Sequence, residues 1–558
     1  MPSSGQGGPS RIPSRDHEIA GGDSRVAATI DHVIVIALEN RSFDHMLGYL
    51  QHPDASFDGL LGAGPYENPG WGGGTPVSAT PDAKYVLPLD PDHSHEAVML
   101  QLGATRRGGS WQVDNRGFVD SFERKGRGLA APSFDGVLAP LVALCKRLTA
   151  AATIKDRGPL AMRCQATSQV PVLSELALKF GTCTRWFSSV PGETWPNRNF
   201  LHSATSDGTT VNETRFYDNR TIFELLEEAG KSWHIYYDDT PQVWAFHELW
   251  DSDDRRRNWY RSSEFANHVH SGQLPNYSFI EPNHRPPLHL EPYLPVVGQH
   301  DHGSSQHPGN NLVADKDYDG CPPSGPGDFA RAEALIAEVY EALRSNPELF
   351  QRSVLLVTYD EHGGLYDHVG PPGGVPAPGG KPQPGLLGRL LRFLLRRKTT
   401  FFDFTLLGVR VPAIVISPYV PAGVISATPR DHASVPSTLR ALFAPTHGPL
   451  TKRDEWAPPF HTMLTLDQPR TADLPDLSGH AAPAAALASP TGAPESATAP
   501  LPGKGPEPPL PDHYQELVEL ADLVDEKLPG PVAPTTMGPR AKAQHVTAEF
   551  QHNAESAR

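Results

Sequence analysis

The chain has 558 residues, which is enough for one large domain with insertions or for two to three domains. Its formal net charge of -16 argues against general nucleic-acid binding through a basic surface. The 4 cysteines lack CxxC spacing, which argues against a zinc-finger site, and no apolar run reaches the roughly 18 residues of a membrane-spanning helix.

The beginning of the chain lacks the apolar stretch of a classical signal peptide. We interpret residues 1–28 as a disordered leader. The sequence therefore predicts a cytoplasmic protein, or one that is exported by a route without a cleaved signal.

The first regular element is predicted to be a buried strand that ends in polar groups. Residues 33–38 are all apolar, and Glu39 and Asn40 follow directly. Ser42 or Asp44 then offers an N-cap for a helix. Open α/β sheets bind ligands beyond the carboxyl ends of their strands, so this pair is a candidate ligand-binding group.

A turn rich in hydroxyls follows a short strand predicted over residues 182–187. Ser188, Ser189 and Thr194 lie between this strand and a helix. A hydroxyl on a strand-to-helix turn is how an α/β fold presents a nucleophile, although an ordinary helix N-cap is the commoner use. The spacing alone leaves all three hydroxyls open.

Other polar side chains are candidates for contact with an anionic group. Asn197 and Arg198, just after this turn, are donors that suit a phosphate-like group. His93 lies in the DPDHSHE stretch over residues 90–96, on a loop that enters a helix. The alternative for His93 is a structural or merely exposed histidine.

A second apolar run, residues 354–357, is followed by Asp360, Glu361 and a Gly-Gly pair. This stretch is built like the first one. If the two strands are neighbours in a parallel sheet, their ends supply four oxygen-bearing side chains to one cation. A solvated turn is the alternative for this stretch taken alone.

Strands and helices are predicted to alternate along the chain. Further helices are expected over 171–181, 221–230, 328–344 and 431–443, and further strands over 232–237, 277–280 and 411–417. This order predicts the α/β class, with a mainly parallel central sheet and helices on both of its faces.

Residues 385–402 combine arginines at helical spacing with leucines on the opposite side and two phenylalanines at the end. A basic amphipathic helix of this kind lies in a membrane interface, so this segment is a candidate for peripheral membrane contact. The alternative is a helix that packs on the protein with a solvated basic face.

The composition changes near the C-terminus. Residues 468–512 are rich in Pro, Ala and Thr and are interpreted as a linker. One helix is expected over 513–528, followed by a disordered tail to residue 558.

The strand-end residues and the hydroxyl turn together suggest a chemistry. A hydroxyl bound to a divalent cation loses its proton more easily and becomes a nucleophile near neutral pH. Its attack on a phosphoester gives a covalent phospho-enzyme. Histidine, Asn and Arg donors would stabilise the phosphoryl oxygens, and a histidine would protonate the leaving alcohol.

The chain resembles the phosphoesterase family that includes bacterial and plant non-specific phospholipases C and a group of acid phosphatases. The matching stretches are ENRSFDHMLGYL (39–50), DPDHSH (90–95), ETWPNRNFLHSATS (193–206), TYDEHGGLYDHVGPP (358–372), VRVPAIVISPYV (409–420) and DHASVPSTLRALF (431–443). The resemblance implies an alkaline-phosphatase-like fold for a catalytic domain over 29–467. Residues 284–327 and 373–405 look like insertions into it.

The resemblance implies a metal site at the two strand ends. Glu39, Asn40, Asp360 and Glu361 look like its ligands. One divalent ion is expected, and oxygen ligands fit calcium, magnesium or manganese, with zinc as a further alternative.

The resemblance also implies roles for the remaining candidates. Thr194 matches the family's Thr or Ser nucleophile, and His93 matches a phosphate-contacting histidine. For the second such histidine, His307 in a His-Pro motif competes with His284.

Three functions remain in contention. The first is a phospholipase C that releases diacylglycerol and a phosphorylated head group from glycerophospholipids. The second is an acid phosphatase for soluble phosphomonoesters that uses the same residues. The third is a catalytically silent lipid- or protein-binding module, against which the intact set of candidate residues argues.

Overall fold

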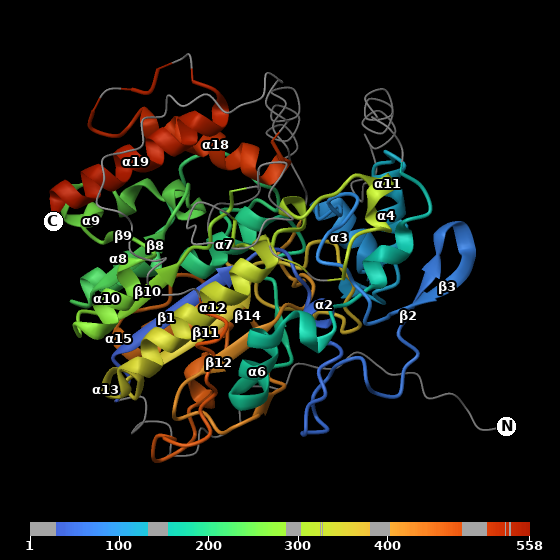
Figure 1. The fold of residues 1–558 in the computed structure, drawn as a ribbon, viewed down its shortest axis with the longest axis horizontal. Coiled ribbons are helices and arrows are strands. Elements are labelled where there is room, and N and C mark those ends of the chain that lie inside the picture. Colours follow the sequence, from blue (N-terminus) through green and yellow to red (C-terminus); the bar gives the residue numbers. More distant parts are fainter. Residues whose placement is uncertain are drawn as a thin grey trace.

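A central sheet organises the computed structural model, which describes residues 29–131, 154–285, 303–323, 325, 327–379, 402–481, 510–530, 532–534 and 537–558. The sheet has eight strands (Figure 1). In order across the sheet they are β13 (Ile425–Ser426), β6 (Gly181–Cys183), β12 (Ala413–Ile416), β11 (Ser353–Tyr359), β1 (His32–Leu38), β10 (Tyr277–Ile280), β8 (Trp233–Tyr237) and β9 (Trp259–Arg261).

The strands β1 and β11 are parallel neighbours in the middle of the sheet. Their register runs from His32 opposite Ser353 to Leu38 opposite Tyr359. Both strands are almost entirely buried, which explains their continuous apolar sequences: layers of the protein cover both faces of a parallel sheet. The predicted adjacency of these two strands is confirmed, and their carboxyl ends lie level with each other.

The sheet is mainly parallel, as the sequence predicts. Of its eight strands, β12 runs against both of its neighbours, β11 and β6, and the other pairings are parallel. The predicted strand over 182–187 is two short pieces, because β6 belongs to the central sheet whereas β7 (Trp186–Phe187) pairs with β14 (Arg430–Asp431). Smaller antiparallel pairs join β2 (Glu67–Gly70) to β3 (Gly74–Ser78) and β4 (Thr105–Arg107) to β5 (Ser110–Gln112).

Helices pack in groups around the sheet. One group contains α6, α10 and α12, of which α12 crosses in front of β1 and β11 in Figure 1, and another contains α7, α8 and α15. The helices are α2 (Phe43–Leu47), α3 (His95–Gln101), α4 (Phe118–Gly126), α6 (Pro171–Lys179), α7 (Thr194–Ser203), α8 (Ile222–Glu228), α9 (Asp253–Arg256), α10 (Glu264–His270), α11 (Asp315–Tyr318), α12 (Asp328–Ser345), α13 (Pro347–Phe350), α15 (Ser434–Phe443), α16 (Lys452–Trp456), α18 (Asp512–Asp525) and α19 (Pro539–Ala557). The α/β class predicted from the order of elements is confirmed.

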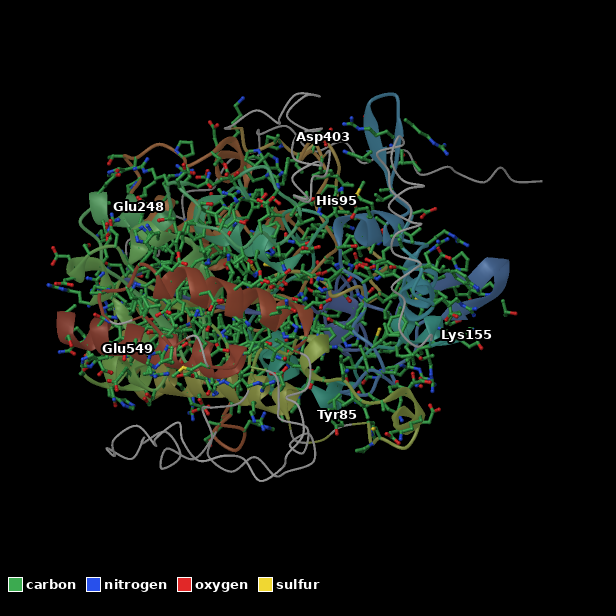
Figure 2. The ribbon with its side chains drawn as sticks, turned by 90° about the horizontal axis from the view of Figure 1, so that it is seen from above. Tyr85, His95, Lys155, Glu248, Asp403 and Glu549 are labelled. Carbon is green, nitrogen blue, oxygen red and sulfur yellow. The ribbon has the colours of Figure 1, made fainter. Side chains whose placement is uncertain are left out.

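The prediction of a disordered tail after residue 528 is wrong. Helix α19 follows α18, and the two pack against each other in red in Figure 1. Figure 2 places α19, marked by Glu549, at the end of the molecule remote from Lys155. The apolar side of α19 carries Phe550, whose ring contacts Tyr237, Trp244, Trp250 and Trp259 with centroids 4.6 to 6.1 Å apart. This aromatic pocket orders a segment whose own sequence is mostly small and polar.

Several predicted segments lie outside the described residues. They are the leader 1–28, most of the basic segment 385–402, the linker residues 482–509 and residues 286–302 of the predicted insertion. Within the described part of the chain, no helix combines the length and the apolar character that crossing a bilayer requires.

Candidate active site

The carboxyl ends of β1 and β11 bring the four predicted metal ligands into one buried region. Glu39, Asn40, Asp360 and Glu361 are each at most 3% exposed. The two strand ends are joined directly, because the backbone N–H of Asn40 donates to Oδ1 of Asp360 at 3.1 Å. Asn40 has a φ of 58°, a left-handed conformation that asparagine tolerates better than most residues.

The Gly-Gly pair after Glu361 allows the chain to pass close to this region. Both glycines have positive φ, 63° at Gly363 and 70° at Gly364. A Cβ on Gly363 would lie 2.2 Å from the carbonyl oxygen of Asn40, and one on Gly364 would lie 3.0 Å from that of Asp92. A side chain at Gly363 would therefore push the two strand ends apart, and one at Gly364 would push against the loop before α3.

Arg198 is the fixed positive charge behind the carboxylates. Its Nε lies 3.1 Å from Oδ2 of Asp360, one Nη lies 2.9 Å from Oε1 of Glu281, and the other lies 3.6 Å from Oε1 of Glu39. The Arg198 side chain is fully buried, and its contacts are with protein groups. It holds the carboxylates in place from the inner side.

Asn197 and Arg198, which the sequence predicts as contacts for a substrate anion, bond to protein groups in this structure. The side-chain amide of Asn197 hydrogen-bonds to the backbone of the preceding turn. Its Oδ1 accepts from the N–H of Val190 at 3.0 Å, and its Nδ2 donates to the carbonyls of Val190, Gly192 and Glu193. The hydrogen bonds that both side chains make in the described part of the chain go to protein groups. Their position near the turn made them look like substrate contacts in the sequence.

His284 is held between two carboxylates. Its Nδ1 lies 2.9 Å from Oε2 of Glu39, and its Nε2 lies 3.0 Å from Oε1 of Glu281. Burial alone would lower its pKa, but these two carboxylates raise the pKa of His284 to about 10. His284 therefore lies between Glu39 and Glu281, with one ring nitrogen toward each carboxylate.

His93 approaches the site from the loop before α3. Its Nδ1 lies 3.0 Å from Oε1 of Glu361. Burial opposes the charge on the ring, but Glu361 and then Asp90 raise the pKa of His93 to about 10. Burial alone would raise the pKa of Glu361, but His93 and His362 lower the pKa of this carboxyl to about 2.

Asp360 has the opposite character. Burial raises its pKa to about 8, and Glu39 and Glu361 add to the effect of burial while Arg198 opposes it. The region thus holds more buried carboxylates than fixed positive charges. An additional cation would favour the ionised form of Asp360.

Thr194 is the hydroxyl that reaches this region. It is the first residue of α7, and its Oγ1 donates to Oδ1 of Asn40 at 3.2 Å. The other two hydroxyls are used for packing, since Ser188 donates to the carbonyl of Val409 and Ser189 accepts from the N–H of His432. Of the three hydroxyls between which the spacing does not choose, Thr194 is therefore the one that contacts Asn40.

His307 lies on the other side of Asn40, with its Nε2 2.8 Å from the Asn40 amide nitrogen. Its Nδ1 accepts the N–H of Gly309 at 2.9 Å. Burial, followed by the nearby His513, holds the pKa of His307 well below its usual range. Of the two competing histidines, His307 therefore lies beside the Asn40–Thr194 contact, whereas His284 lies behind Glu39.

Two groups of side chains in the described part of the chain bring three metal-binding atoms within 4.8 Å of one another. The predicted four-ligand set is not one of them. In the group of Asp44, Asp367 and His368, the guanidinium of Arg410 already occupies the cation position, 2.8 Å from Oδ1 of Asp44 and 3.0 Å from Oδ1 of Asp367. That group is an ion-pair network that joins the two motif stretches.

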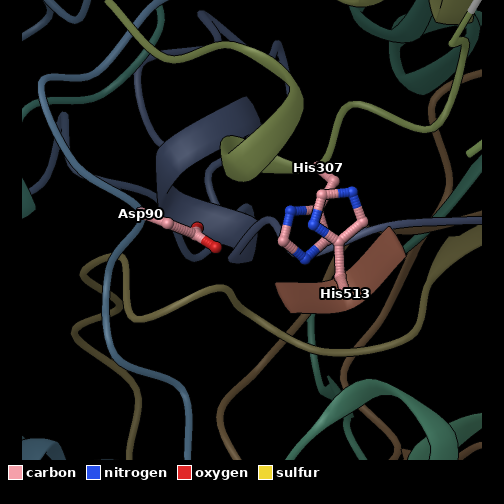
Figure 3. Close-up of side chains that lie close together, drawn as sticks. All are labelled: Asp90, His307 and His513. Atoms are coloured by element: carbon pink, nitrogen blue, oxygen red, sulfur yellow. The ribbon is translucent and has the colours of Figure 1, made fainter. Parts of the chain in front are cut away.

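The other group contains a residue from a distant part of the chain, His513, for which the sequence predicts no role in the site. Asp90, His307 and His513 converge as shown in Figure 3, and His513 is carried by α18 at the C-terminal end of the chain. Its ring stacks on that of His307 with centroids 3.8 Å apart and planes 15° apart. No local motif surrounds His513, so the sequence offered no signal for its position.

Comparisons with known proteins agree with this architecture. Residues 30–444 match the Phosphoesterase family. Non-specific phospholipase C3 of Arabidopsis thaliana is 31% identical over 482 residues, which cover 82% of this chain and 79% of that protein. Phospholipase C B of Mycobacterium tuberculosis is 26% identical over 499 residues, which cover 80% of this chain and 82% of that protein.

Solved structures give weaker likenesses. The phosphonate monoester hydrolase of Agrobacterium radiobacter superposes with a TM-score of 0.29 and 13% identity, over 54% of this chain and 73% of that one. Superposition of this extent carries no argument about the site. The sequence matches cover most of the chain, and they show that it belongs to the Phosphoesterase family and is a hydrolase that acts on phosphoric ester bonds.

Proposed function

We propose that the protein is a metal-dependent phospholipase C that cleaves glycerophospholipids through a Thr194 phospho-enzyme. The observation that carries this proposal is the contact between Thr194 and Asn40 at the meeting point of β1, β11 and α7. The relatives at 26 to 32% identity whose names contain phospholipase C support the choice of substrate.

The predicted ligand set fits a hard divalent cation. Glu39, Asn40, Asp360 and Glu361 all offer oxygen and are buried, and of the three carboxylates Glu39 and Asp360 lie against the guanidinium of Arg198. When bound there, the ion would stabilise charge on the phosphoryl group and lower the pKa of the nearby hydroxyl. Oxygen ligands suit calcium, magnesium or manganese, and zinc is the alternative.

The side chains divide the remaining work. Asn40 orients the Thr194 hydroxyl, whose oxygen attacks phosphorus while the bond to the diacylglycerol oxygen breaks. His93 uses Nδ1 to contact Glu361, which leaves Nε2 to donate to a phosphoryl oxygen or to the leaving oxygen. Water then hydrolyses the phosphothreonine, which regenerates the hydroxyl and releases the phosphorylated head group.

The basic segment 385–402 is the proposed contact with the lipid surface. Reversing its charge at Arg389, Arg392 and Arg396 to Glu should reduce turnover of vesicles and leave turnover of a water-soluble ester unchanged. Equal turnover of vesicles by this variant and the wild type would exclude this role. Sedimentation with anionic vesicles measures the contact directly.

A parallel assay tests the function. Purified protein, with and without chelator, is given phosphatidylcholine vesicles and p-nitrophenyl phosphate. We expect chelator-sensitive release of diacylglycerol with little cleavage of the monoester. The reverse preference would make the protein a phosphatase for monoesters. Absence of turnover on both substrates, after reloading with each candidate metal, would favour a silent binding module.

A further inference from the structure

We propose that Asp90 and His513 form a subsite beside Asn40 and Thr194 that accepts a cation, and that the ammonium of a phospholipid head group is its occupant. The choice of occupant rests on the proposed function, and the subsite itself rests on the contacts of His513, Asp90 and Gly309.

The hydrogen bonds around His513 define which of its nitrogens carries the proton. The amide nitrogen of Asn310 donates to the carbonyl of His284 at 3.3 Å and to Oγ of Ser305 at 3.2 Å. The amide oxygen of Asn310 therefore faces His513, whose Nε2 lies 3.0 Å away. Because an amide oxygen only accepts, Nε2 is the N–H and Nδ1 carries a lone pair.

That lone pair faces a carboxylate with no donor between them. Nδ1 of His513 and Oδ1 of Asp90 are both buried atoms without a hydrogen-bond partner among the described residues. A Cβ built on Gly309 would lie 2.9 Å from Nδ1 of His513 and 3.0 Å from Oδ2 of Asp90. Asp90 thus turns Oδ2 toward the open face of Gly309, beside Nδ1 of His513, and its Oδ1 is buried without a partner. A buried carboxylate and a buried lone pair this close together favour a donor or a cation between them.

The subsite adjoins the candidate nucleophile through a chain of contacts. Thr194 bonds to Asn40, Asn40 lies against His307, and His307 stacks on His513 (Figure 3). A phosphoryl group at Thr194 would therefore place its remaining substituent, the head group, near Asp90 and His513. A positively charged head group is the part of a phospholipid that two acceptors attract.

A second metal ion is the other source of positive charge, and the geometry favours it less. His307, the third member of the group, accepts the N–H of Gly309 at Nδ1, so its proton is on Nε2, which lies 2.8 Å from the Asn40 side-chain amide. Only one carboxylate and one imidazole nitrogen then remain for a metal, whereas protein metal sites usually provide at least about three ligands.

Two variants remove the acceptors with little change of shape. Asp90→Asn removes the charge, and His513→Phe keeps a ring against His307 but removes the lone pair. His552→Gln is the matched control, because His552 is an exposed histidine on the same pair of C-terminal helices. Thermal unfolding of each variant confirms that it is folded.

The readout compares two soluble diesters with the same leaving group, p-nitrophenylphosphorylcholine and bis(p-nitrophenyl) phosphate. We expect each acceptor variant to raise KM for the choline ester about tenfold more than KM for bis(p-nitrophenyl) phosphate, which lacks the ammonium, and this difference corresponds to about 1.4 kcal/mol. His552→Gln should leave the ratio of the two KM values unchanged. Equal changes on both esters, with unchanged metal content, would overturn the subsite.

Two further measurements separate the alternatives. Metal content by mass spectrometry identifies the cation: loss of one metal ion in both variants would assign the subsite to a second metal, and unchanged content with the shifted KM ratio assigns it to the ammonium. Calorimetric titration of the holoenzyme with phosphocholine and with inorganic phosphate tests the subsite without turnover. If the wild type cleaves neither ester, the proposed function fails, and tighter binding of phosphocholine that is lost in Asp90→Asn still supports the subsite.

Discussion

The Oγ1 of Thr194 lies 3.2 Å from Oδ1 of Asn40, although 154 residues separate them in the chain. The contact joins the start of α7 to the end of β1. Asn40 in turn donates its backbone N–H to Asp360 at the end of β11. One asparagine therefore connects the candidate nucleophile to both predicted ligand pairs.

Replacing Thr194 with Ala should abolish turnover. The loss of an attacking oxygen is expected to lower kcat on the order of 10³-fold or more, because among the described residues the two other hydroxyls of this turn, Ser188 and Ser189, bond to Val409 and His432 instead of Asn40. Thr194→Ser retains the oxygen and should keep measurable activity. Ser188→Ala is the matched control, since Ser188 bonds to the carbonyl of Val409 away from the site. A Thr194→Ala protein with wild-type kcat would refute the assignment.

Asp360→Asn should weaken metal binding. The variant keeps the shape of the side chain but removes one of the buried negative charges, so we expect the metal affinity to fall at least about 100-fold. Titration of the metal-free protein, followed by calorimetry, measures this affinity. Asp44→Asn is the comparison, because Arg410 already neutralises Asp44. If both variants bind metal like the wild type, the ligands lie elsewhere.

The ion pair of His368 predicts a pH dependence of stability. Burial opposes the charge, but Asp44 at 2.6 Å and Asp58 at 3.1 Å raise the pKa of His368 from 6.5 to about 9. A raised pKa stabilises the fold fully below the unfolded value, and this contribution is lost as pH rises from 6.5 through 9.

Urea unfolding at pH 6 and at pH 9.5 measures that contribution. The wild type should lose up to about 3 kcal/mol more of its unfolding free energy over this interval than His368→Gln, which cannot titrate. The exposed-site variant His552→Gln should follow the wild type. An identical pH dependence in His368→Gln would show that the pair contributes nothing in this range.

Phe550→Ala should release α19 from the body of the protein. Its ring fills a pocket of Tyr237, Trp244, Trp250 and Trp259, so truncation is expected to cost about 3 to 5 kcal/mol of unfolding free energy. Urea unfolding measures this cost, and limited proteolysis should cut the variant first after residue 528. Equal stability and equal protease resistance would mean that the helix does not depend on this contact.

The sequence was sufficient for the centre of the fold. The apolar runs that became β1 and β11 each lead to a pair of oxygen-bearing side chains, and parallel strands place such ends at one edge of the sheet. Local patterns also identified α12 and β10 nearly to the residue. These elements can be predicted from the spacing of apolar residues, which a short stretch of chain already contains.

The finer assignments depended on contacts between distant segments. Asn197 and Arg198 looked like ligands for an anion because spacing does not reveal that Asn197 donates to the carbonyl of Val190 and that Arg198 donates to Glu281 and Asp360. His513 was invisible as a site residue, because it meets His307 only when α18 packs on the domain. Which partner a polar side chain finds is decided by tertiary structure.

The direct test of the account is the mass of the protein during turnover. Wild-type protein is mixed with a phosphorylcholine ester, quenched in acid within milliseconds to seconds and analysed by intact-protein mass spectrometry and peptide mapping. We predict a transient adduct equal to the phosphoryl head group, located on Thr194 and missing from Thr194→Ala and from chelated protein. An adduct on another residue, or steady turnover that leaves no adduct while Thr194→Ala stays active, would contradict the account.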